Sequence, residues 1–274
     1  MKCVFPIAGY GTRFLPITKV IPKEMLPIMS KPLVEYAIDE ALDANIDSMI
    51  MVINEQKELI RDYFASNSYL DEHLRNKKNP LIDLNQKISA CKFIFTYQKN
   101  MLGLGNAIFQ AKKFCRTDRF AVILPDDLCF NDNSNVLKQM RDLSNLYPKH
   151  CIIAIEEVSS NDVEKYGIID GKVDKFRKDI FHVENLIEKP SPAEAPSNLA
   201  IIGRYLLTPD IFTAIENISA DNNGEIQITD ALLELARKGR VIAYKFKGKR
   251  FDCGSPKGFN QAIRYIESGR QVIE

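Results

Sequence analysis

The chain has 274 residues, which is long enough for one large domain or two small ones with a well-buried core. Hydrophobic residues make up 45% and charged residues 27% of the sequence, as is ordinary for a globular protein. The 37 Lys and Arg residues nearly balance the 36 Asp and Glu residues and leave a formal charge of +1. This balance argues against nucleic acid or a membrane surface as the main partner, so local clusters of charge must hold any anionic ligand.

The six cysteines are scattered without Cys-x-x-Cys spacing, and with only three histidines present we expect no zinc site. Cys3, Cys129 and Cys151 lie inside apolar runs, as buried free thiols do, which favours a reducing, cytoplasmic compartment. The N-terminal apolar run is too short for a signal peptide and is broken by Pro6. No stretch approaches about 18 apolar residues, so we expect no membrane span.

The first predicted strand, Cys3–Ile7, leads directly into a glycine turn. Residues 8–13 read Ala-Gly-Tyr-Gly-Thr-Arg, and two lysines follow, Lys19 and Lys23. Glycines let backbone N–H groups approach an anion, and Arg and Lys supply positive charge, so the segment predicts a triphosphate cradle. Phe14 stands where a dinucleotide fingerprint has its third glycine, and the spacing of a P-loop is missing. An ordinary turn between strand and loop also fits an isolated Gly-x-Gly.

Strand-like runs then alternate with helical patterns along the first half of the chain. We expect a helix over Pro32–Ala44, a strand over Met49–Ile53, a helix over Glu55–Phe64 capped by Asn54, a strand over Lys92–Thr96, a helix near Asn106–Phe114 and a strand over Phe120–Leu124. The alternation predicts βαβ units and a mainly parallel sheet. Ligands of such sheets bind beyond the carboxyl ends of the strands.

The pattern changes in the second half of the chain. In the first half, the polar segment Tyr69–Asn85 predicts a surface insertion. After Cys151 we expect short strands separated by turns such as Asp170-Gly171. The expected strands and helices are Tyr166–Asp170, His182–Glu188, Leu199–Leu206, a helix over Gln227–Lys238, a strand over Val241–Phe246 and a helix over Ser255–Ser268.

The segment after the buried strand that ends at Leu124 supplies two candidate metal ligands, Asp126 and Asp127. Mg²⁺ prefers oxygen ligands and, when it is bound to phosphates, usually takes only one or two carboxylates. A turn capped by Asp is the alternative interpretation.

The order of these motifs resembles that of the sugar-1-phosphate nucleotidylyltransferases. Gly-x-Gly-Thr-Arg in the first turn is followed by Lys-Glu-Met-Leu-Pro at residues 23–27, and the similarity covers essentially the whole chain. The resemblance implies an α/β, Rossmann-like nucleotide-diphospho-sugar transferase fold with a mixed, mainly parallel central sheet flanked by helices. It further implies a single domain over residues 1–274, with a nucleotide-binding half at about 1–150 and a sugar-binding lobe and C-terminal helices at about 151–274.

The resemblance also implies roles for individual residues. The implied nucleotide contacts are Ala8, Gly9, Gly11, Thr12, Glu24, Gln98 and Gly103. The implied sugar contacts are Gly167, Glu188 and Lys189. The implied metal ligands are Asp126 and Asp252. The implied catalytic residues are Arg13, Lys23, Asp126 and Lys189.

The sugar motif and the base motif each lead to a more specific expectation. Neighbours on a strand point to opposite sides, so we expect Glu188 and Lys189 to have separate roles, and a bend at Pro190 would be needed to bring both to one ligand. Position 106 often carries His in the family, and we expect the Asn106 of this chain to leave the base contacts unaltered. A Gln side chain such as that of Gln98 offers both a donor and an acceptor to a uracil edge.

The implied activity is Mg²⁺-dependent transfer of a uridylyl group from UTP to glucose 1-phosphate, which yields UDP-glucose and pyrophosphate by in-line attack. A sister enzyme that uses dTTP and a non-catalytic regulatory homologue remain the alternatives. The family also implies a homo-oligomer, either a dimer or a tetramer, in cytoplasmic carbohydrate metabolism and polysaccharide biosynthesis. We expect neither nucleic acid nor a membrane as a partner.

Overall fold

The computed structural model describes residues 1–74, 81–131 and 133–269. Its strands are β1 (Lys2–Pro6), β2 (Pro27–Ile28), β3 (Lys31–Pro32), β4 (Ser48–Ile53), β5 (Lys92–Tyr97), β6 (Phe120–Ile123), β7 (Asp127–Phe130), β8 (Cys151–Glu157), β9 (Gly167–Val173), β10 (Ile180–Glu188), β11 (Leu199–Leu207), β12 (Val241–Lys245) and β13 (Lys249–Asp252). Its α-helices are α1 (Leu33–Asp43), α2 (Glu58–Tyr63), α3 (Ser68–Leu74), α4 (Ile82–Ala90), α5 (Gly103–Phe109), α6 (Val136–Ser144), α7 (Asp210–Asn217), α8 (Ile228–Ala236) and α9 (Pro256–Glu267).

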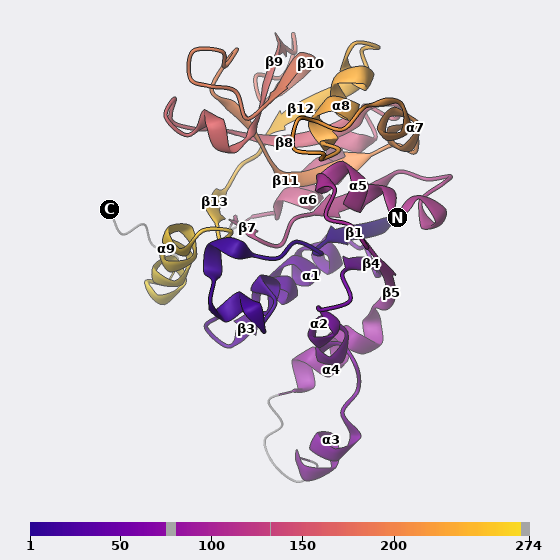
Figure 1. Cartoon of the computed structure of the whole chain (residues 1–274), viewed down its shortest axis with the longest axis vertical. Helices are drawn as coiled ribbons and strands as arrows, with labels where there is room; N and C mark the ends of the chain where they lie inside the picture. Colours follow the sequence, from indigo (N-terminus) through magenta and orange to yellow (C-terminus); the bar gives the residue numbers. More distant parts are fainter. Residues whose placement is uncertain (75–80, 132, 270–274) are drawn as a thin grey trace.

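A mixed sheet of nine strands, in the order β5-β4-β1-β6-β11-β8-β12-β10-β9, runs through the molecule (Figure 1). The first four of these strands are parallel, as the alternation in the first half of the sequence predicts. β11 is antiparallel to both β6 and β8, and the far end of the sheet is antiparallel except for the β8–β12 pair. The carboxyl ends of β4, β1, β5 and β6 therefore share one edge, where the glycine turn, Gln98 and Asp126 follow their strands.

Helices cover both faces of the sheet, and this explains why Cys3, Val4 and Phe5 of β1 are all apolar. Val4 belongs to a core cluster with residues of α5, α7 and α8, whereas Cys3 and Phe5 belong to a second cluster with residues of α1 and α6. Successive side chains of a strand point to opposite faces, so a strand buried on both faces has no polar positions. This burial explains the continuous apolar run before the glycine turn.

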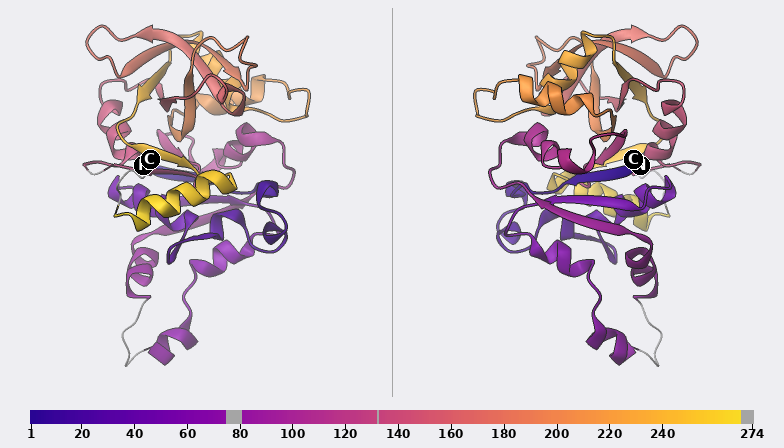
Figure 2. Two further views of the ribbon diagram at one scale, coloured as in Figure 1. Left: turned by 90° about the vertical axis from the view of Figure 1, so that its left-hand side faces the viewer. Right: turned by 90° about the vertical axis from the view of Figure 1, so that its right-hand side faces the viewer.

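The C-terminal segment returns to the N-terminal half of the chain. β13 pairs with β7 in a separate two-stranded sheet, and α9 packs over a small core that includes Ile28, Leu33, Phe251 and Ala262 (Figure 2). Asp252 at the end of β13 is thereby brought beside the turn between β6 and β7. Residues far apart in the sequence meet at the edge where the parallel strands end.

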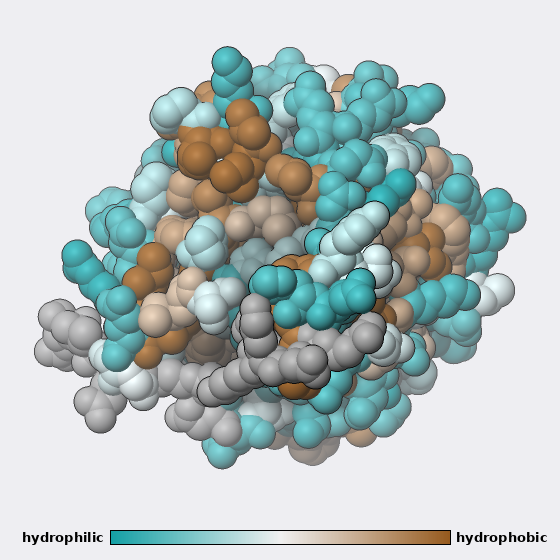
Figure 3. Space-filling model, turned by 90° about the horizontal axis from the view of Figure 1, so that it is seen from below, coloured by the Kyte–Doolittle hydropathy of each residue, from teal (hydrophilic) through white to brown (hydrophobic). Residues whose placement is uncertain are grey.

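Of the segment predicted as a surface insertion, the described residues in α3 stand away from the rest of the molecule, whereas Leu84 in α4 packs against the core. α3 lies at the far lower end of the ribbon, and within the described residues 68–74 no side chain is buried (Figures 1 and 2). Residues 75–80 of this insertion lie outside the described residues. Seen from below, the surface is largely hydrophilic, with several apolar areas between hydrophilic side chains (Figure 3). In the described part of the chain, no helix combines the length and the apolarity needed to cross a membrane.

Two predictions about a helix cap and a turn need correction. Asn54 does not cap a helix that starts at Glu55, because its Oδ1 accepts from the N–H of Gln56 in a turn and α2 begins only at Glu58. Asp170-Gly171 is not a turn but part of β9. A Cβ on Gly171 would lie 2.4 Å from the carbonyl oxygen of His182, so glycine permits close approach of β10 beside a bulge.

The structure also differs from the sequence prediction in the bounds of one helix and in two helices that were not predicted. The helix predicted near Asn106–Phe114 begins earlier, at Gly103, and its last part is a separate 3₁₀ turn over Lys112–Phe114. The strongly amphipathic helices α6 and α7 were missing from the sequence prediction. Their apolar faces contribute Leu137 and Met140, and Phe212 and Ile215, to the two core clusters.

Candidate active site

The glycine turn after β1 folds back on itself and brings Lys23 to its centre. Gly11 adopts the left-handed conformation, with φ 65°, just before the 3₁₀ turn η1 (Thr12–Phe14). Its carbonyl oxygen accepts a hydrogen bond from the Thr18 hydroxyl at 2.8 Å. A Cβ on Gly11 would lie 3.1 Å from Cβ of Lys23, so the loop packs closely against the stem of this lysine. Thr12 and Arg13 are exposed, as residues that contact a ligand must be.

Lys23 and Asp126 form an ion pair at the carboxyl edge of the sheet, with 2.5 Å between Lys23 Nζ and Asp126 Oδ2. Burial by itself would raise the pKa of the Asp126 carboxyl, but the charge of Lys23 and the hydrogen bond from it hold this pKa below its usual value. Burial likewise opposes the charge of Lys23, and Asp126 together with Glu24 raises the pKa of the lysine. Both groups are therefore ionised at neutral pH.

The carboxylates of Asp126 and Asp252 converge with Arg13 around Gly254. A Cβ built on Gly254 would lie 2.9 Å from Asp126 Oδ2, 3.0 Å from Asp252 Oδ1 and 3.5 Å from Arg13 Nη1. Burial, followed by the charge of Asp127, raises the pKa of Asp252 above its usual value, and the charge of Asp126 adds to the effect. A divalent cation beside the two carboxylates would relieve this repulsion, and hard oxygen donors are the ligands that Mg²⁺ prefers.

Two carboxylates fit a metal ion whose other ligands come from phosphates and water rather than from a closed protein cage. Within the part of the chain that the structure describes, no group of three or more His, Cys, Asp or Glu side chains is arranged to hold a metal ion. The donor set therefore suits Mg²⁺ that arrives with a nucleotide.

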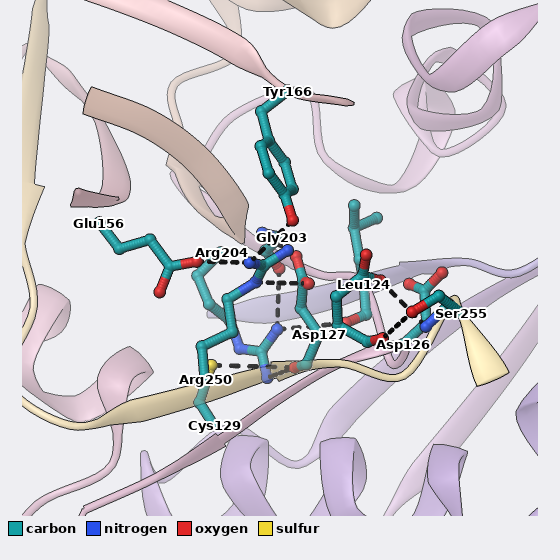
Figure 4. Close-up of polar contacts among 12 residues, drawn as sticks. Leu124, Asp126, Asp127, Cys129, Glu156, Tyr166, Gly203, Arg204, Arg250 and Ser255 are labelled. Carbon is teal, nitrogen blue, oxygen red and sulfur yellow. Dashed lines mark hydrogen bonds and ion pairs between the residues drawn. The ribbon is translucent and has the colours of Figure 1, made fainter. Parts of the chain in front are cut away.

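Asp127 has different partners from those of Asp126 (Figure 4). Its Oδ2 accepts from the backbone N–H of Gly203 at 2.6 Å, and its Oδ1 accepts from Arg250 Nε at 2.6 Å. Arg250 also pairs with Glu156 and lies over the ring of Tyr166, with 4.8 Å to the ring centroid. Asp127 thus joins the β7–β13 ribbon to the central sheet.

Arg204 supports the turn between β6 and β7 from below. Only 1% of this residue is exposed, and its guanidinium pairs with the buried carboxylate of Glu40 at 2.8 Å. It also donates to the carbonyl oxygens of Leu124 at 3.1 Å and Asp127 at 2.7 Å (Figure 4). These two carbonyls flank Asp126, so Arg204 fixes the backbone that presents the Asp126 carboxylate.

A cavity of about 180 Å³ opens between the two halves of the chain beside this cluster. Its lining joins Arg13, Asp126 and Asp252 to Gly167 and Glu188. Arg13 of the predicted triphosphate cradle, the two predicted metal ligands and two of the predicted sugar contacts therefore meet on one cavity.

Glu188 is held in place on the wall of this cavity. Its Oε2 accepts from the Thr229 hydroxyl at 2.6 Å. A Cβ on Gly167 would lie 3.2 Å from the same carboxylate oxygen, so a larger residue there would crowd it. Thr229 belongs to α8, and the sequence did not single it out.

Lys189 lies outside the cavity, at the bend that ends β10. The bend is at Lys189 itself, with φ 46°, and not at Pro190. This left-handed conformation is unusual for a residue with a side chain. It turns the lysine toward its neighbour, so that Lys189 Nζ lies 3.4 Å from Glu188 Oε1 although neighbours on a regular strand point apart.

A second hollow, of about 310 Å³, lies on the other side of the glycine turn. Its lining includes Tyr10, Asn54, Gln56 and Gln98. Gln98 is only 4% exposed, and its Nε2 donates to the carbonyl oxygen of Gly103 at 3.1 Å and to Asn106 Oδ1 at 3.0 Å. The sequence expectation for Asn106 overlooked this contact with a predicted base-binding residue.

Two of the predicted nucleotide contacts are buried beneath the site. The carbonyl oxygen of Ala8 accepts a hydrogen bond from Asn54 Nδ2. The carboxylate of Glu24 forms a buried ion pair with Lys57, with 2.7 Å between Lys57 Nζ and Glu24 Oε2. Both residues therefore hold the cradle from within, and Gly9 beside Ala8 has open space around its Cα.

Sequence reasoning missed Lys57, and it gave no individual role to Thr229, Arg204 or Arg250. It offered Asp127 as a candidate metal ligand, whereas in the structure Asp127 pairs with Arg250. The sequence does contain a signal for Arg204, because this charged residue stands inside an apolar strand. A charge that is buried in a strand requires a partner of opposite charge. A wider groove of about 920 Å³ lies elsewhere, between α1, α4 and α6. It includes none of the predicted site residues, and ion pairs among Lys87, Glu35 and Asp39 occupy this region.

Comparison with known proteins agrees with this geometry. Residues 7–269 match the family described as Nucleotidyl transferase. A UTP–glucose-1-phosphate uridylyltransferase of Pseudomonas aeruginosa is 49% identical over 267 residues, which are 96% of this chain and 95% of that protein. A crystal structure of apo UDP-glucose pyrophosphorylase is 46% identical, with a TM-score of 0.93 over 98% of this chain and 99% of that one.

A crystal structure of UDP-glucose pyrophosphorylase complexed with UDP-glucose is also 46% identical, with a TM-score of 0.89 over the same shares of the two chains. These matches confirm the fold class and the resemblance on which the residue assignments depend. The chain belongs to the nucleotidyl transferase family.

Proposed function

We propose that this chain transfers the uridylyl group of UTP to glucose 1-phosphate and releases pyrophosphate. The observation that supports this most is the cavity on which Arg13, Asp126, Asp252 and Glu188 meet, because it joins a triphosphate cradle to a polar sugar-sized site. The relatives that match over nearly the whole chain are named for this activity. The sugar phosphate oxygen attacks the α-phosphorus of UTP, the bond to the β-phosphate oxygen breaks, and pyrophosphate leaves.

Positioning and charge neutralisation supply the catalysis, because this displacement requires no covalent intermediate on the protein. The guanidinium of Arg13 and the backbone N–H groups of residues 9–12 bind the triphosphate. Lys23, held by Asp126, offsets negative charge that grows toward the leaving pyrophosphate. Glu24 acts indirectly, since its pairing with Lys57 keeps the loop that carries Lys23 in place.

Mg²⁺ fits the pair of carboxylates from Asp126 and Asp252, and when bound it supplies Lewis-acid neutralisation of the phosphate oxygens. Asp126 is proposed as the principal ligand because it stands at the carboxyl end of β6. Asp252 is proposed as a secondary ligand from the C-terminal segment.

The sugar side of the site is proposed to use Glu188, Gly167 and Lys189. The Glu188 carboxylate, oriented by Thr229, accepts hydrogen bonds from glucose hydroxyls. Gly167 lines the same cavity, and its missing Cβ lets the Glu188 carboxylate and the Thr229 hydroxyl lie close to the backbone there. Lys189 extends from the bend at the end of β10 and grips the phosphate of glucose 1-phosphate. On the other side of the cradle, Gln98 and Gly103 bind the base.

We further propose that residues 1–274 form one domain, with a nucleotide-binding half at about 1–150 and a sugar-binding lobe at about 151–274. One continuous sheet through both halves supports this division within a single unit. The six free cysteines are consistent with a cytoplasmic setting. The family resemblance suggests a homo-oligomer, either a dimer or a tetramer.

The test is an assay of pyrophosphate release across pairs of nucleotides and sugar phosphates with Mg²⁺. We expect UTP with glucose 1-phosphate to give UDP-glucose at about 1–10³ s⁻¹. The reverse reaction should also proceed, because one phosphoanhydride bond replaces another. A clear preference for dTTP would favour the sister activity. Tight UTP binding without pyrophosphate release would favour a regulatory homologue.

A further inference from the structure

The oxygen of Asp126 that faces the second carboxylate of the site is also the oxygen that Lys23 holds. Lys23 Nζ lies 2.5 Å from Asp126 Oδ2. The same Oδ2 lies 2.9 Å from the position of a Cβ built on Gly254, and Asp252 Oδ1 lies 3.0 Å from that position. Turning the carboxylate over exchanges two equivalent oxygens and leaves one of them in this place. A metal ion shared by Asp126 and Asp252 therefore requires the oxygen that pairs with Lys23.

The surroundings of Lys23 hold its ammonium group at this oxygen. A Cβ on Gly11 would lie 3.1 Å from Cβ and 3.3 Å from Cγ of Lys23, so the glycine turn packs against the stem of the lysine. The neighbouring carboxylate of Glu24 pairs with Lys57 at 2.7 Å and does not draw Lys23 away. Only 19% of the Lys23 side chain and 21% of the Asp126 side chain are exposed, so water screens this ion pair only in part.

The charges around Gly254 cancel when no nucleotide is bound. Asp126 and Asp252 supply two negative charges, and Lys23 and Arg13 supply two positive ones. A divalent cation that enters alone gains little net attraction from these four groups, and it meets the Lys23 ammonium group at the oxygen it needs. A triphosphate changes this balance, because its oxygens offer Lys23 another anionic partner.

We infer that Lys23 keeps the metal ion out of the nucleotide-free site and releases Asp126 only when a triphosphate arrives to accept its charge. The lysine and the metal ion thus occupy Asp126 Oδ2 in turn. The inference rests on the proposed function, in which Asp126 is the principal metal ligand and Lys23 neutralises the phosphates. It adds that the ion pair in this structure is the metal-free state of the site. Because such coupling is reciprocal, the triphosphate and the metal ion strengthen the binding of each other.

Lys23→Met tests this inference, because methionine keeps an unbranched stem and removes the charge. The measurement is the dissociation constant of Mn²⁺ from the nucleotide-free chain, obtained from the electron paramagnetic resonance signal of free Mn²⁺ at pH 8, where the carboxyl groups are ionised. Mn²⁺ takes the carboxylate and water ligands that suit Mg²⁺. Lys19→Met is the matched control, since it removes the same charge from an exposed position in the same loop. The double variant Lys23→Met with Asp126→Asn identifies the site that binds the ion.

We expect Lys23→Met to bind Mn²⁺ at least about tenfold more tightly than the wild-type chain, because it removes a like charge beside the ligand oxygen. Lys19→Met should stay within about twofold of wild type, since water and salt screen an exposed charge. The double variant should lose the gain in affinity. Thermal unfolding checks that the variants are folded, and Lys23→Gln replaces Lys23→Met if the latter is not.

The inference is overturned if Lys23→Met binds Mn²⁺ no more tightly than wild type, if Lys19→Met gains as much, or if the double variant keeps the gain. Pyrophosphate release by the wild-type chain separates this result from the proposed function. Turnover of UTP without a gain of affinity in Lys23→Met contradicts the inference alone. A gain that depends on Asp126, in a chain that turns over no nucleotide, contradicts the proposed function alone.

Discussion

Asp126 and Asp127 are neighbours in the sequence, but their carboxylates serve different parts of the structure. Asp126 lies 2.5 Å from Lys23 Nζ and faces the cavity with Asp252 and Arg13. Asp127 also lines this cavity, but each of its oxygens accepts a hydrogen bond at 2.6 Å, one from the N–H of Gly203 and the other from Arg250. The same charge is therefore available to a ligand at one position and committed to the fold at the next.

Replacing Asp126 by Asn should reduce turnover by about 10²-fold or more, by analogy with the removal of one preorganised electrostatic contact. Asp127→Asn is the matched control, because it removes the same charge one residue away. The measurement is kcat over a series of Mg²⁺ concentrations. Asp127→Asn should shift the Mg²⁺ dependence less than Asp126→Asn does, and Asp252→Asn should have an intermediate effect. Full activity of Asp126→Asn at limiting Mg²⁺ would contradict the assignment.

Replacing Arg204 by Met should destabilise the chain by about 3–5 kcal/mol, because it leaves the Glu40 carboxylate buried without a cation. Urea unfolding measures this change. The double variant Glu40→Gln with Arg204→Met should recover part of the loss, since no uncompensated charge then remains. A single variant within about 0.5 kcal/mol of wild type, as for an ordinary surface substitution, would show that the pair does not stabilise the β6–β7 turn.

The sequence predicted the parallel half of the sheet well, because β1, β4 and β6 are buried on both faces and contain uninterrupted apolar runs. It also placed the glycine turn and the acidic turn at the edge where they lie. The local pattern could not separate the roles of Asp126 and Asp127, and only the family resemblance singled out Asp126. The partners of Asp127 come from β11 and β13, 76 and 123 residues away, and no local pattern records such contacts.

The bend at Lys189 shows a second limit of sequence patterns. A left-handed residue before Pro190 has no local signature in a lysine, because glycine or asparagine would be the usual choice. The surrounding structure holds the conformation, since the N–H of Lys189 donates to the carbonyl of Tyr166 at 3.0 Å. Only the fold brings Tyr166 beside the end of β10.

Removal of the divalent metal should stop both directions of the proposed reaction. Without the cation, the two carboxylates around Gly254 only add negative charge beside the triphosphate. EDTA in excess over Mg²⁺ is the test, with pyrophosphate release and UTP formation as the two readouts. Activity should return when Mg²⁺ is restored in excess. The cysteine and histidine side chains give no reason to expect that Zn²⁺ would restore it as well. Turnover that survives EDTA in either direction would refute the metal assignment.

Replacing Glu188 and replacing Lys189 should have different effects on the kinetics, although Glu188 Oε1 and Lys189 Nζ lie only 3.4 Å apart. Lys189→Ala should raise the KM for glucose 1-phosphate and lower kcat, because the lysine grips the phosphate that attacks. Glu188→Ala should mainly relax the discrimination between glucose 1-phosphate and galactose 1-phosphate, by about tenfold, because it removes an acceptor for sugar hydroxyls.

Thr229→Val should act in the same direction as Glu188→Ala but less strongly, since it removes only the group that orients the carboxylate. Steady-state kinetics with both sugar phosphates distinguish these effects, and unchanged sugar-phosphate affinity in both single variants would show that this pair does not bind the sugar.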